Sequence, residues 1–398
     1  MGLLIAKSLG LLVVAILVAI AARRLRLPYT VGLVIAGITL ALSHGDPGIL
    51  LTRDVIFDLL LPPLLFEAAL NLNAGALRRD ALPILTLSIF GVMVSAAVVF
   101  LGMRYVLGWP VAPALAFGVL IAATDPVAVI ALFKDLGVTG RFRILVESES
   151  LFNDGAAAVL FALVLSWLVD DRAAAASWTL VLTMSGGGIV TGIAVGFAGL
   201  LIAGRTGDHL VETAVTVVAS YGAFLLAENL NFSGVLATVA AGLVIGSASL
   251  RAGGQRLGLS RHGREFALEF WEFLAFIANS TVFLLMGIAA SRISFAAIGY
   301  LPLAAAIALV LLARAAAVYP LAFFFRGSRW AIAGRDQHIL WWAGLRGALA
   351  LALALSLPPQ MPMRDGVIIA TFGVTIFSVI VQGLTMSTFL RVLGIGRP

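Results

Sequence analysis

Hydrophobic residues occur along the chain in runs of roughly 20, and the short stretches between these runs hold most of the charged residues. A run of this length suits an α-helix that crosses a bilayer, which needs about 17–25 residues. A transmembrane strand would instead be a short segment of alternating polarity. The pattern therefore predicts an all-α polytopic membrane protein with 13 transmembrane helices, near residues 3–22, 29–42, 54–76, 81–103, 111–133, 145–169, 178–203, 208–228, 232–249, 265–290, 299–325, 337–356 and 366–390.

Composition supports this prediction and excludes whole classes of protein. Hydrophobic residues make up 61% of the 398 residues, charged residues only 12%, and the mean hydropathy is +1.09. Soluble domains have about 45–50% apolar and about 25% charged residues, so a soluble enzyme is excluded. The chain has no cysteine, which excludes disulfides, thiol catalysis and metal sites with cysteine ligands.

The distribution of basic residues predicts the topology. Loops after odd-numbered helices hold 18 of the 26 Lys and Arg residues, and loops after even-numbered helices hold 5. Because short cytoplasmic loops collect Lys and Arg, we expect a multi-pass protein of the cell membrane with its N-terminus outside and its C-terminus in the cytoplasm. The net charge of +6 then reflects topology and not a nucleic-acid surface. Residues 1–22 also fit a signal peptide, and the charge pattern leaves that alternative open.

The sixth predicted helix carries ionisable residues at membrane depth. Glu147, Ser150 and Asp154 share one stripe of the helix, and Glu149 and Asn153 form the neighbouring stripe. Asp154 lies about 15 Å along the helix from its cytoplasmic end, near the bilayer midplane. An ionisable side chain there costs about 2.5–3.5 kcal/mol on insertion scales, so it is a candidate functional residue.

The fifth predicted helix is interrupted by Asp125 and Pro126. Proline has no amide hydrogen and disfavours a helical conformation at the residue before it, so backbone carbonyls are freed at this point. Freed carbonyls beside a carboxylate suit a small hard cation. The alternative interpretation is a proline kink in which Asp125 is hydrogen-bonded locally.

The twelfth predicted helix is interrupted at Gly344–Ala348, which contains Arg346. A buried arginine needs a partner, and we expect Glu149 to pair with it. Breaks in helices 5 and 12 fit two inverted six-helix repeats, helices 1–6 and 8–13, joined by helix 7. Glu67 and Arg314 also lie within helices, where a structural ion pair is as plausible as a transport role.

Glycines mark one further feature. Gly188, Gly192 and Gly196 form a ridge of small residues in helix 7, which lets a neighbouring helix approach closely. The run Gly186–Gly188 lacks the Gly-Lys-Ser/Thr ending of a phosphate-binding loop, so no nucleotide partner is expected.

These motifs together resemble the NhaP-type sodium/proton antiporters of the cation:proton antiporter-1 family, which are related to eukaryotic sodium/proton exchangers. The resemblance covers nearly the whole chain and rests on four segments in the expected helices, namely Leu61–Glu67, Ala123–Pro126, Glu149–Asp154 and Gly344–Ala348. It implies crossed, discontinuous helices 5 and 12 and an ion site at their crossing.

The resemblance also implies roles for individual residues. Sodium would be bound by the Thr124 carbonyl, Asp125, Ser150 and Asp154, with Glu149 taking part directly or through water. Asn153 and Arg346 would support Glu149, and Pro126 would hold the break. It further implies a homodimer in lipid. Its expected parts are interface helices 1–3 (1–80), core helices 4–6 (81–170), linking helix 7 (171–206), interface helices 8–9 (207–264) and 10 (265–292), and core helices 11–13 (293–398).

The expected function is secondary antiport of sodium, and also lithium, for protons, with both ions competing for Asp154. Electrogenic relatives carry two adjacent aspartates where this chain has Asn153-Asp154, so one sodium for one proton, an electroneutral exchange, is expected. No cofactor is needed. A potassium/proton antiporter is the nearest alternative, because cavity size and ligand flexibility decide the cation. A cation channel is a more distant alternative.

Overall fold

A computed structural model describes residues 2–25, 27–44, 51–135, 137–169, 177–251 and 258–394. Every element in these ranges is helical, and none of the described residues forms a strand. The prediction of an all-α protein is therefore confirmed. The helices, in chain order, are α1 (Gly2–Leu25), α2 (Tyr29–His44), η1 (Val55–Leu60), α3 (Leu61–Asn71), α4 (Ala74–Arg79), α5 (Ala81–Leu85), η2 (Thr86–Phe90), α6 (Gly91–Tyr105), α7 (Val111–Leu120), α8 (Val127–Asp135), α9 (Arg141–Val169), α10 (Ser177–Ala203), α11 (His209–Asn229), α12 (Gly234–Arg251), α13 (Arg261–Arg292), η4 (Phe295–Ala297), α14 (Tyr300–Phe324), α15 (Gly334–Trp342), α16 (Ala348–Leu355), α17 (Arg364–Phe377), η5 (Ser378–Gln382) and α18 (Gly383–Val392).

Each predicted span coincides with one helix or with a run of consecutive helices. Among the described residues, seven helical segments are long and apolar enough to cross a membrane, and the number 13 for all spans stays a prediction. The predicted end of the third span was wrong. Helix α3 ends at Asn71, and Asn73 then starts α4 by accepting hydrogen bonds from the backbone N–H groups of Gly75 and Ala76. Asparagine is favoured at such N-caps because its side chain satisfies free N–H groups.

The two predicted helix breaks are present. The fifth span stops at the end of α7, runs as a turn and then without regular secondary structure over residues 121–126, and resumes as α8. The twelfth span stops at the end of α15 and resumes as α16 after residues 343–347. Pro126 accounts for the first break because it cannot donate a helical hydrogen bond. Glycines at 344 and 347, which are poor helix formers, contribute to the second.

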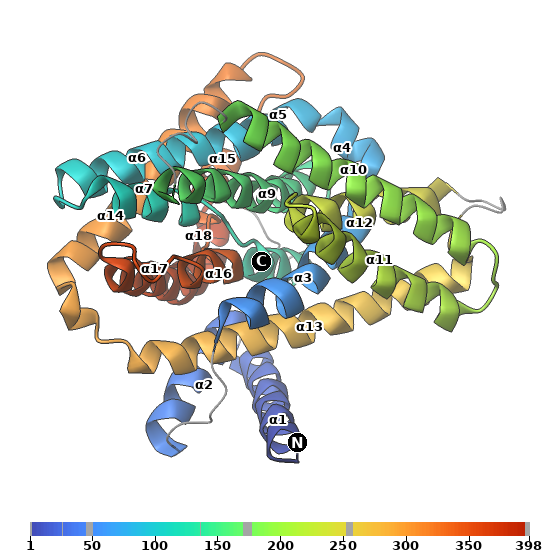
Figure 1. Cartoon of the computed structure of the whole chain (residues 1–398), viewed down its shortest axis with the longest axis horizontal. Coiled ribbons are helices and arrows are strands. Elements are labelled where there is room, and N and C mark those ends of the chain that lie inside the picture. The colour runs from blue at the N-terminus through green and yellow to red at the C-terminus, as the bar shows by residue number, and fades with distance from the viewer. Residues whose placement is uncertain are drawn as a thin grey trace. The chain divides into compact units, whose positions relative to one another are not determined.

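The chain divides into two compact units, of which the first comprises residues 1–56, 82–153 and 279–398. In this unit α6 packs against α7 and α14, and α17 packs against α14 and α16 (Figure 1). The halves α7 and α16 of the two broken spans also contact each other. The breaks therefore belong to the same packed unit.

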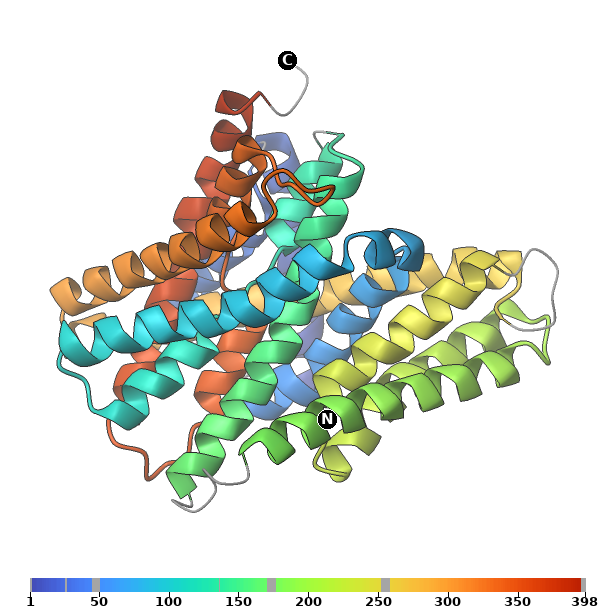
Figure 2. The same cartoon turned by 90° about the horizontal axis from the view of Figure 1, so that it is seen from above.

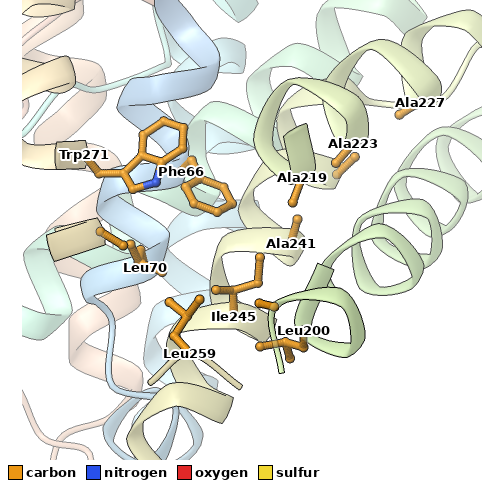
Figure 3. Packing of buried hydrophobic residues seen from close by; sticks show 13 residues of the cluster. Phe66, Leu70, Leu200, Ala219, Ala223, Ala227, Ala241, Ile245, Leu259 and Trp271 are labelled. Atoms are coloured by element: carbon orange, nitrogen blue, oxygen red, sulfur yellow. The ribbon is translucent and has the colours of Figure 1, made fainter. Parts of the chain in front are cut away.

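The second unit comprises residues 57–81 and 154–278. Helices α10, α11 and α12 pack against one another and run side by side (Figure 2), and α3 packs against α12. The core of this unit is apolar and rich in alanine (Figure 3). Its largest members are Phe66 and Trp271, whose ring centroids are 4.5 Å apart. The indole N–H of Trp271 donates to the Thr216 hydroxyl at 2.8 Å, so its one polar group is satisfied.

The predicted close approach at the glycine ridge of α10 is present, and the neighbouring helix is α12. A methyl group at Gly192 would collide with the backbone carbonyl of Ala237, and one at Gly188 would meet the carbonyl of Ser233. Glycine is required there because the two backbones approach too closely for any side chain.

Candidate functional site

The two helix breaks are joined directly through their backbones. The N–H of Asp125, in the first break, donates to the carbonyl of Leu345, in the second, at 2.8 Å. Both groups lie outside any helix, so each would otherwise be an unpaired polar group in the apolar interior. This hydrogen bond holds the two non-helical segments against each other and confirms that helices 5 and 12 meet at their breaks.

The Asp125 carboxyl group contacts both breaks. Its Oδ1 accepts the N–H of Val127 at 2.9 Å and so caps the first turn of α8. The local hydrogen bond that the sequence left as an alternative is therefore present, and it uses one of the two oxygens. The Oδ2 atom packs against Gly347, where an added Cβ would collide with the carboxyl group. Gly347 thus leaves room for the Asp125 carboxyl group beside the second break.

Arg346 crosses from the second break to the first. Its guanidinium Nη1 donates to the carbonyls of Ala122 and Ala123, each at 2.9 Å. Its backbone N–H donates to the Ser378 hydroxyl at 3.0 Å. Arg346 is 2% exposed, so its positive charge is buried. The charge lies at the carbonyls just beyond the C-terminal end of α7, where the helix dipole is negative and favours a cation.

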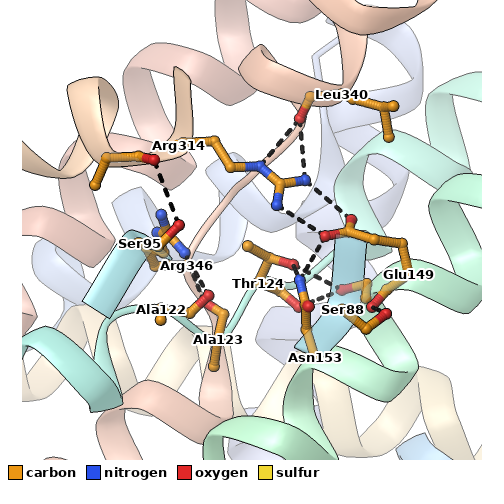
Figure 4. Close-up of polar contacts among 12 residues, drawn as sticks. Ser88, Ser95, Ala122, Ala123, Thr124, Glu149, Asn153, Arg314, Leu340 and Arg346 are labelled. Atoms are coloured by element: carbon orange, nitrogen blue, oxygen red, sulfur yellow. Dashed lines mark hydrogen bonds and ion pairs between the residues drawn. The ribbon is translucent and has the colours of Figure 1, made fainter. Parts of the chain in front are cut away.

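The expected pair between Arg346 and Glu149 was wrong. Glu149 pairs instead with Arg314 of α14, through two parallel hydrogen bonds of 2.8 and 2.9 Å, and both side chains are buried (Figure 4). Arg314 also donates to the carbonyl of Leu340, in the last turn of α15. The planar guanidinium group of arginine matches a carboxylate in this way. The guanidinium group of Arg346 donates to backbone carbonyls instead.

Hydroxyl and amide groups connect α9 to the first break. Asn153 donates from Nδ2 to Glu149 Oε1 at 2.6 Å and to Thr124 Oγ1 at 3.0 Å (Figure 4). Ser150 Oγ donates to the Thr124 carbonyl and lies 3.2 Å from Thr124 Oγ1. Ser88 of η2 donates to the Glu149 carbonyl at 3.0 Å. The hydrogen bond from Asn153 to Glu149 is the contact that the predicted support of Glu149 by Asn153 requires.

Asp154 is the next residue of α9 after Asn153, and it is partly buried. It is the first residue of the second unit, and the residues described above belong to the first. Among the described residues, no three His, Asp or Glu side chains converge to hold a metal ion. The Thr124 carbonyl and the Ser150 hydroxyl group are neutral oxygens of the kind that hard cations accept as ligands.

The structural ion pair considered for Arg314 is present, but its partner, Glu149, was not predicted. A signal was present, because Arg314 lies near the middle of the eleventh predicted span, where a charge needs a partner. Arg314 and Arg346 both lie at membrane depth, however, and either could pair with Glu149. Spacing along the chain does not show which of two helices far apart in sequence packs against α9.

Comparison with known proteins gives consistent matches. The family model for the transmembrane sodium/hydrogen exchanger matches residues 11–392. The Na(+)/H(+) antiporter ApNhaP of Aphanothece halophytica is 40% identical over 374 residues, 93% of this chain and 70% of that protein. NhaH of Halobacillus dabanensis is 33% identical over 404 residues, 98% and 97% of the two chains. The solved structure of the sodium proton antiporter MjNhaP1 from Methanocaldococcus jannaschii has the same fold, with a TM-score of 0.78 at 22% identity over 98% of each chain.

Proposed function

The chain belongs to the sodium/hydrogen exchanger family and is a transporter, not an enzyme, and from that membership we propose that it exchanges sodium, and also lithium, for protons across the cell membrane. The NhaP-type relatives and the shared fold support this function. Sodium and protons are its substrates, and it needs no cofactor.

The observation that carries the proposal is the junction of the two breaks. Asp125, whose backbone joins the two breaks, directly follows Thr124, and the carbonyl and hydroxyl groups of Thr124 both contact the Ser150 hydroxyl group. Broken helices inside a membrane protein commonly supply ion ligands from unwound backbone. We propose that Thr124, Asp125, Ser150 and Asp154 bind the ion, with Glu149 acting through water.

The proposed mechanism is competition with alternating access. A proton or a sodium ion occupies Asp154, and only the loaded core, helices 4–6 and 11–13, moves between inward-facing and outward-facing states. Helices 1–3 and 8–10 form the interface of a homodimer, with the N-terminus outside and the C-terminus in the cytoplasm. One carboxylate exchanged between two monovalent ions makes the exchange electroneutral.

Asp154→Asn in proteoliposomes tests this mechanism. An amide cannot exchange a proton for sodium, so we expect sodium-driven proton movement to be abolished. Asp365→Asn is the matched control because its side chain is 90% exposed at the start of α17, and it should transport like the wild type. Retained exchange in Asp154→Asn would falsify the central role of Asp154.

Ion choice and stoichiometry need a second measurement on the wild type. Proton movement is recorded with sodium, lithium or potassium, with and without a clamped membrane potential. Sodium and lithium should drive it at a rate that the potential does not change. Activity with potassium alone would indicate a potassium/proton antiporter, and current without proton coupling would indicate a channel.

A further inference from the structure

The break in the twelfth span opens one helical hydrogen bond, and both of its ends need other partners. In a continuous α-helix the N–H of residue 346 would donate to the carbonyl of residue 342. Residues 343–347 are not helical here, so this hydrogen bond is not formed. A backbone polar group without a partner is unfavourable in an apolar interior. The break can therefore persist only if other groups bind the two ends.

Both replacement partners are side chains of η5, a π-helix, which is a rare form that is frequent at functional sites. The N–H of Arg346 donates to Ser378 Oγ at 3.0 Å, and Gln382 Nε2 donates to the carbonyl of Trp342 at 3.1 Å. Ser378 gives its own proton to the Thr375 carbonyl at 2.8 Å, so its oxygen is free to accept. Ser378 and Gln382 are buried, and they are the first and last residues of η5. Two residues of this short segment thus replace one helical hydrogen bond.

The backbone that η5 holds makes the contacts to the first break. Leu345, which precedes Arg346, accepts the N–H of Asp125 at 2.8 Å. The Arg346 guanidinium group donates to the carbonyls of Ala122 and Ala123 (Figure 4). If the helix closed, the Leu345 carbonyl would instead face the N–H of residue 349 along the helix axis. The contacts between the two breaks therefore depend on the open conformation of the second break.

We infer that Ser378 and Gln382 are positioning residues for transport, because they keep the twelfth span broken and so hold its backbone against the first break. This inference rests on the proposed function and adds two residues outside its ion site. Neither side chain is a proposed ion ligand. Both act through the backbone of residues 342–346, which carries Leu345 and Arg346 to their partners.

A double-variant cycle tests this inference. Ser378→Ala leaves the N–H of Arg346 without its partner, and Gln382→Met leaves the carbonyl of Trp342 without its partner. In the double variant these two groups can bind each other if the helix closes. The midpoint of thermal unfolding should therefore fall by less than the sum of the two single falls. The KM for sodium in proteoliposomes at fixed pH should rise roughly two- to tenfold in each single variant, the usual size of one lost hydrogen bond, and further in the double variant.

Thr371→Val is the matched control, because it removes a buried hydroxyl group that donates within α17, to the Val367 carbonyl, and it should keep the wild-type KM. Two independent packing roles predict falls in the midpoint that add. Additive falls, or a KM in the double variant no higher than in Thr371→Val, would overturn the inference while the proposed function stands. If the double variant does not fold, Ser378→Thr decides, because it keeps the hydroxyl group. A KM near the wild-type value supports the inference, and a KM as high as in Ser378→Ala contradicts it. No sodium-driven proton movement in the wild type would contradict the proposed function itself, and the unfolding midpoints would still test the inference.

Discussion

The breaks in the fifth and twelfth spans both leave backbone carbonyls that an arginine satisfies, but only one of the two arginines also pairs with a carboxylate. In each, the carbonyls at or beyond the end of the first half-helix receive hydrogen bonds from an arginine of another segment. Arg346 serves the carbonyls that follow α7, and Arg314 serves the carbonyl of Leu340 in α15. Arg314 also has a carboxylate partner, Glu149, and the hydrogen bonds of the Arg346 side chain go to carbonyls.

Because only Arg314 pairs with a carboxylate, we expect the two arginines to have different roles. Arg314 and Glu149 form a neutral pair that joins α9, α14 and α15, which is a structural arrangement. Arg346 brings its charge to the carbonyls that immediately precede Thr124 and Asp125, where the ion is proposed to bind. Under the proposed function, Arg346 is therefore the arginine whose charge lies near the transported ion, and Arg314 holds together the helices that carry the site.

The largest effect is expected from Arg314→Leu. Removing one partner of a buried ion pair typically costs about 3–5 kcal/mol because the other charge is left without compensation. Thermal unfolding of the purified protein should show a strongly lowered midpoint. The double variant Arg314→Leu with Glu149→Gln should recover much of the loss. A control, Arg261→Leu, removes an arginine whose side chain is 96% exposed and should change little.

Arg346→Gln should destabilise the protein less. It loses charge-assisted hydrogen bonds to Ala122 and Ala123, which are worth about 1.5–3 kcal/mol in typical cases, and it leaves no carboxylate stranded. The midpoint of thermal unfolding should fall, but by less than in Arg314→Leu. A variant that is fully stable yet inactive would instead indicate that Arg346 acts directly on the ion.

Gly347→Ala tests the contact between the breaks. The new methyl group must displace the Asp125 carboxyl group, and overpacking of this kind typically costs about 1–3 kcal/mol. We expect a moderate loss of stability together with a raised KM for sodium. Gly334→Ala, at the start of α15, is the matched control because nothing lies within 4 Å of its added methyl group. Normal transport by Gly347→Ala would contradict a requirement for this space.

The smallest effect is expected from Asp336→Asn. Asp336 lies in the first turn of α15, at the end away from the break, and precedes the predicted start of the twelfth span. Burial raises the pKa of Asp336, and Arg335 and Arg141 oppose that rise. A carboxyl group with a raised pKa in the folded state stabilises fully below its unfolded-state pKa, and this contribution is lost as pH rises through the folded-state pKa. In the wild type, the midpoint of thermal unfolding should therefore fall as pH rises from the unfolded-state pKa of Asp336 to its folded-state pKa. In Asp336→Asn this fall should be smaller. The same pH dependence of the unfolding midpoint in the variant and the wild type would contradict this prediction.

The sequence identified most residues of the site but not all of their contacts. Pro126 and the glycines at 344 and 347 predicted the breaks because their effect on a helix is local. Spacing on α9 grouped Ser150 with Asp154 and Glu149 with Asn153 for the same reason. The wrong partner for Glu149 came from a choice between two arginines in different helices, which no local rule decides.

The sequence by itself determined that the chain is helical, apolar along its length and broken at two defined positions. These properties follow from the length of the apolar runs and from the missing N–H of proline, which are fixed by covalent structure. Tertiary structure alone decided which arginine meets Glu149 and which carbonyls accept hydrogen bonds from Arg346. Such pairings depend on where distant helices pack, and a buried charge is satisfied by whichever partner the packing brings within reach.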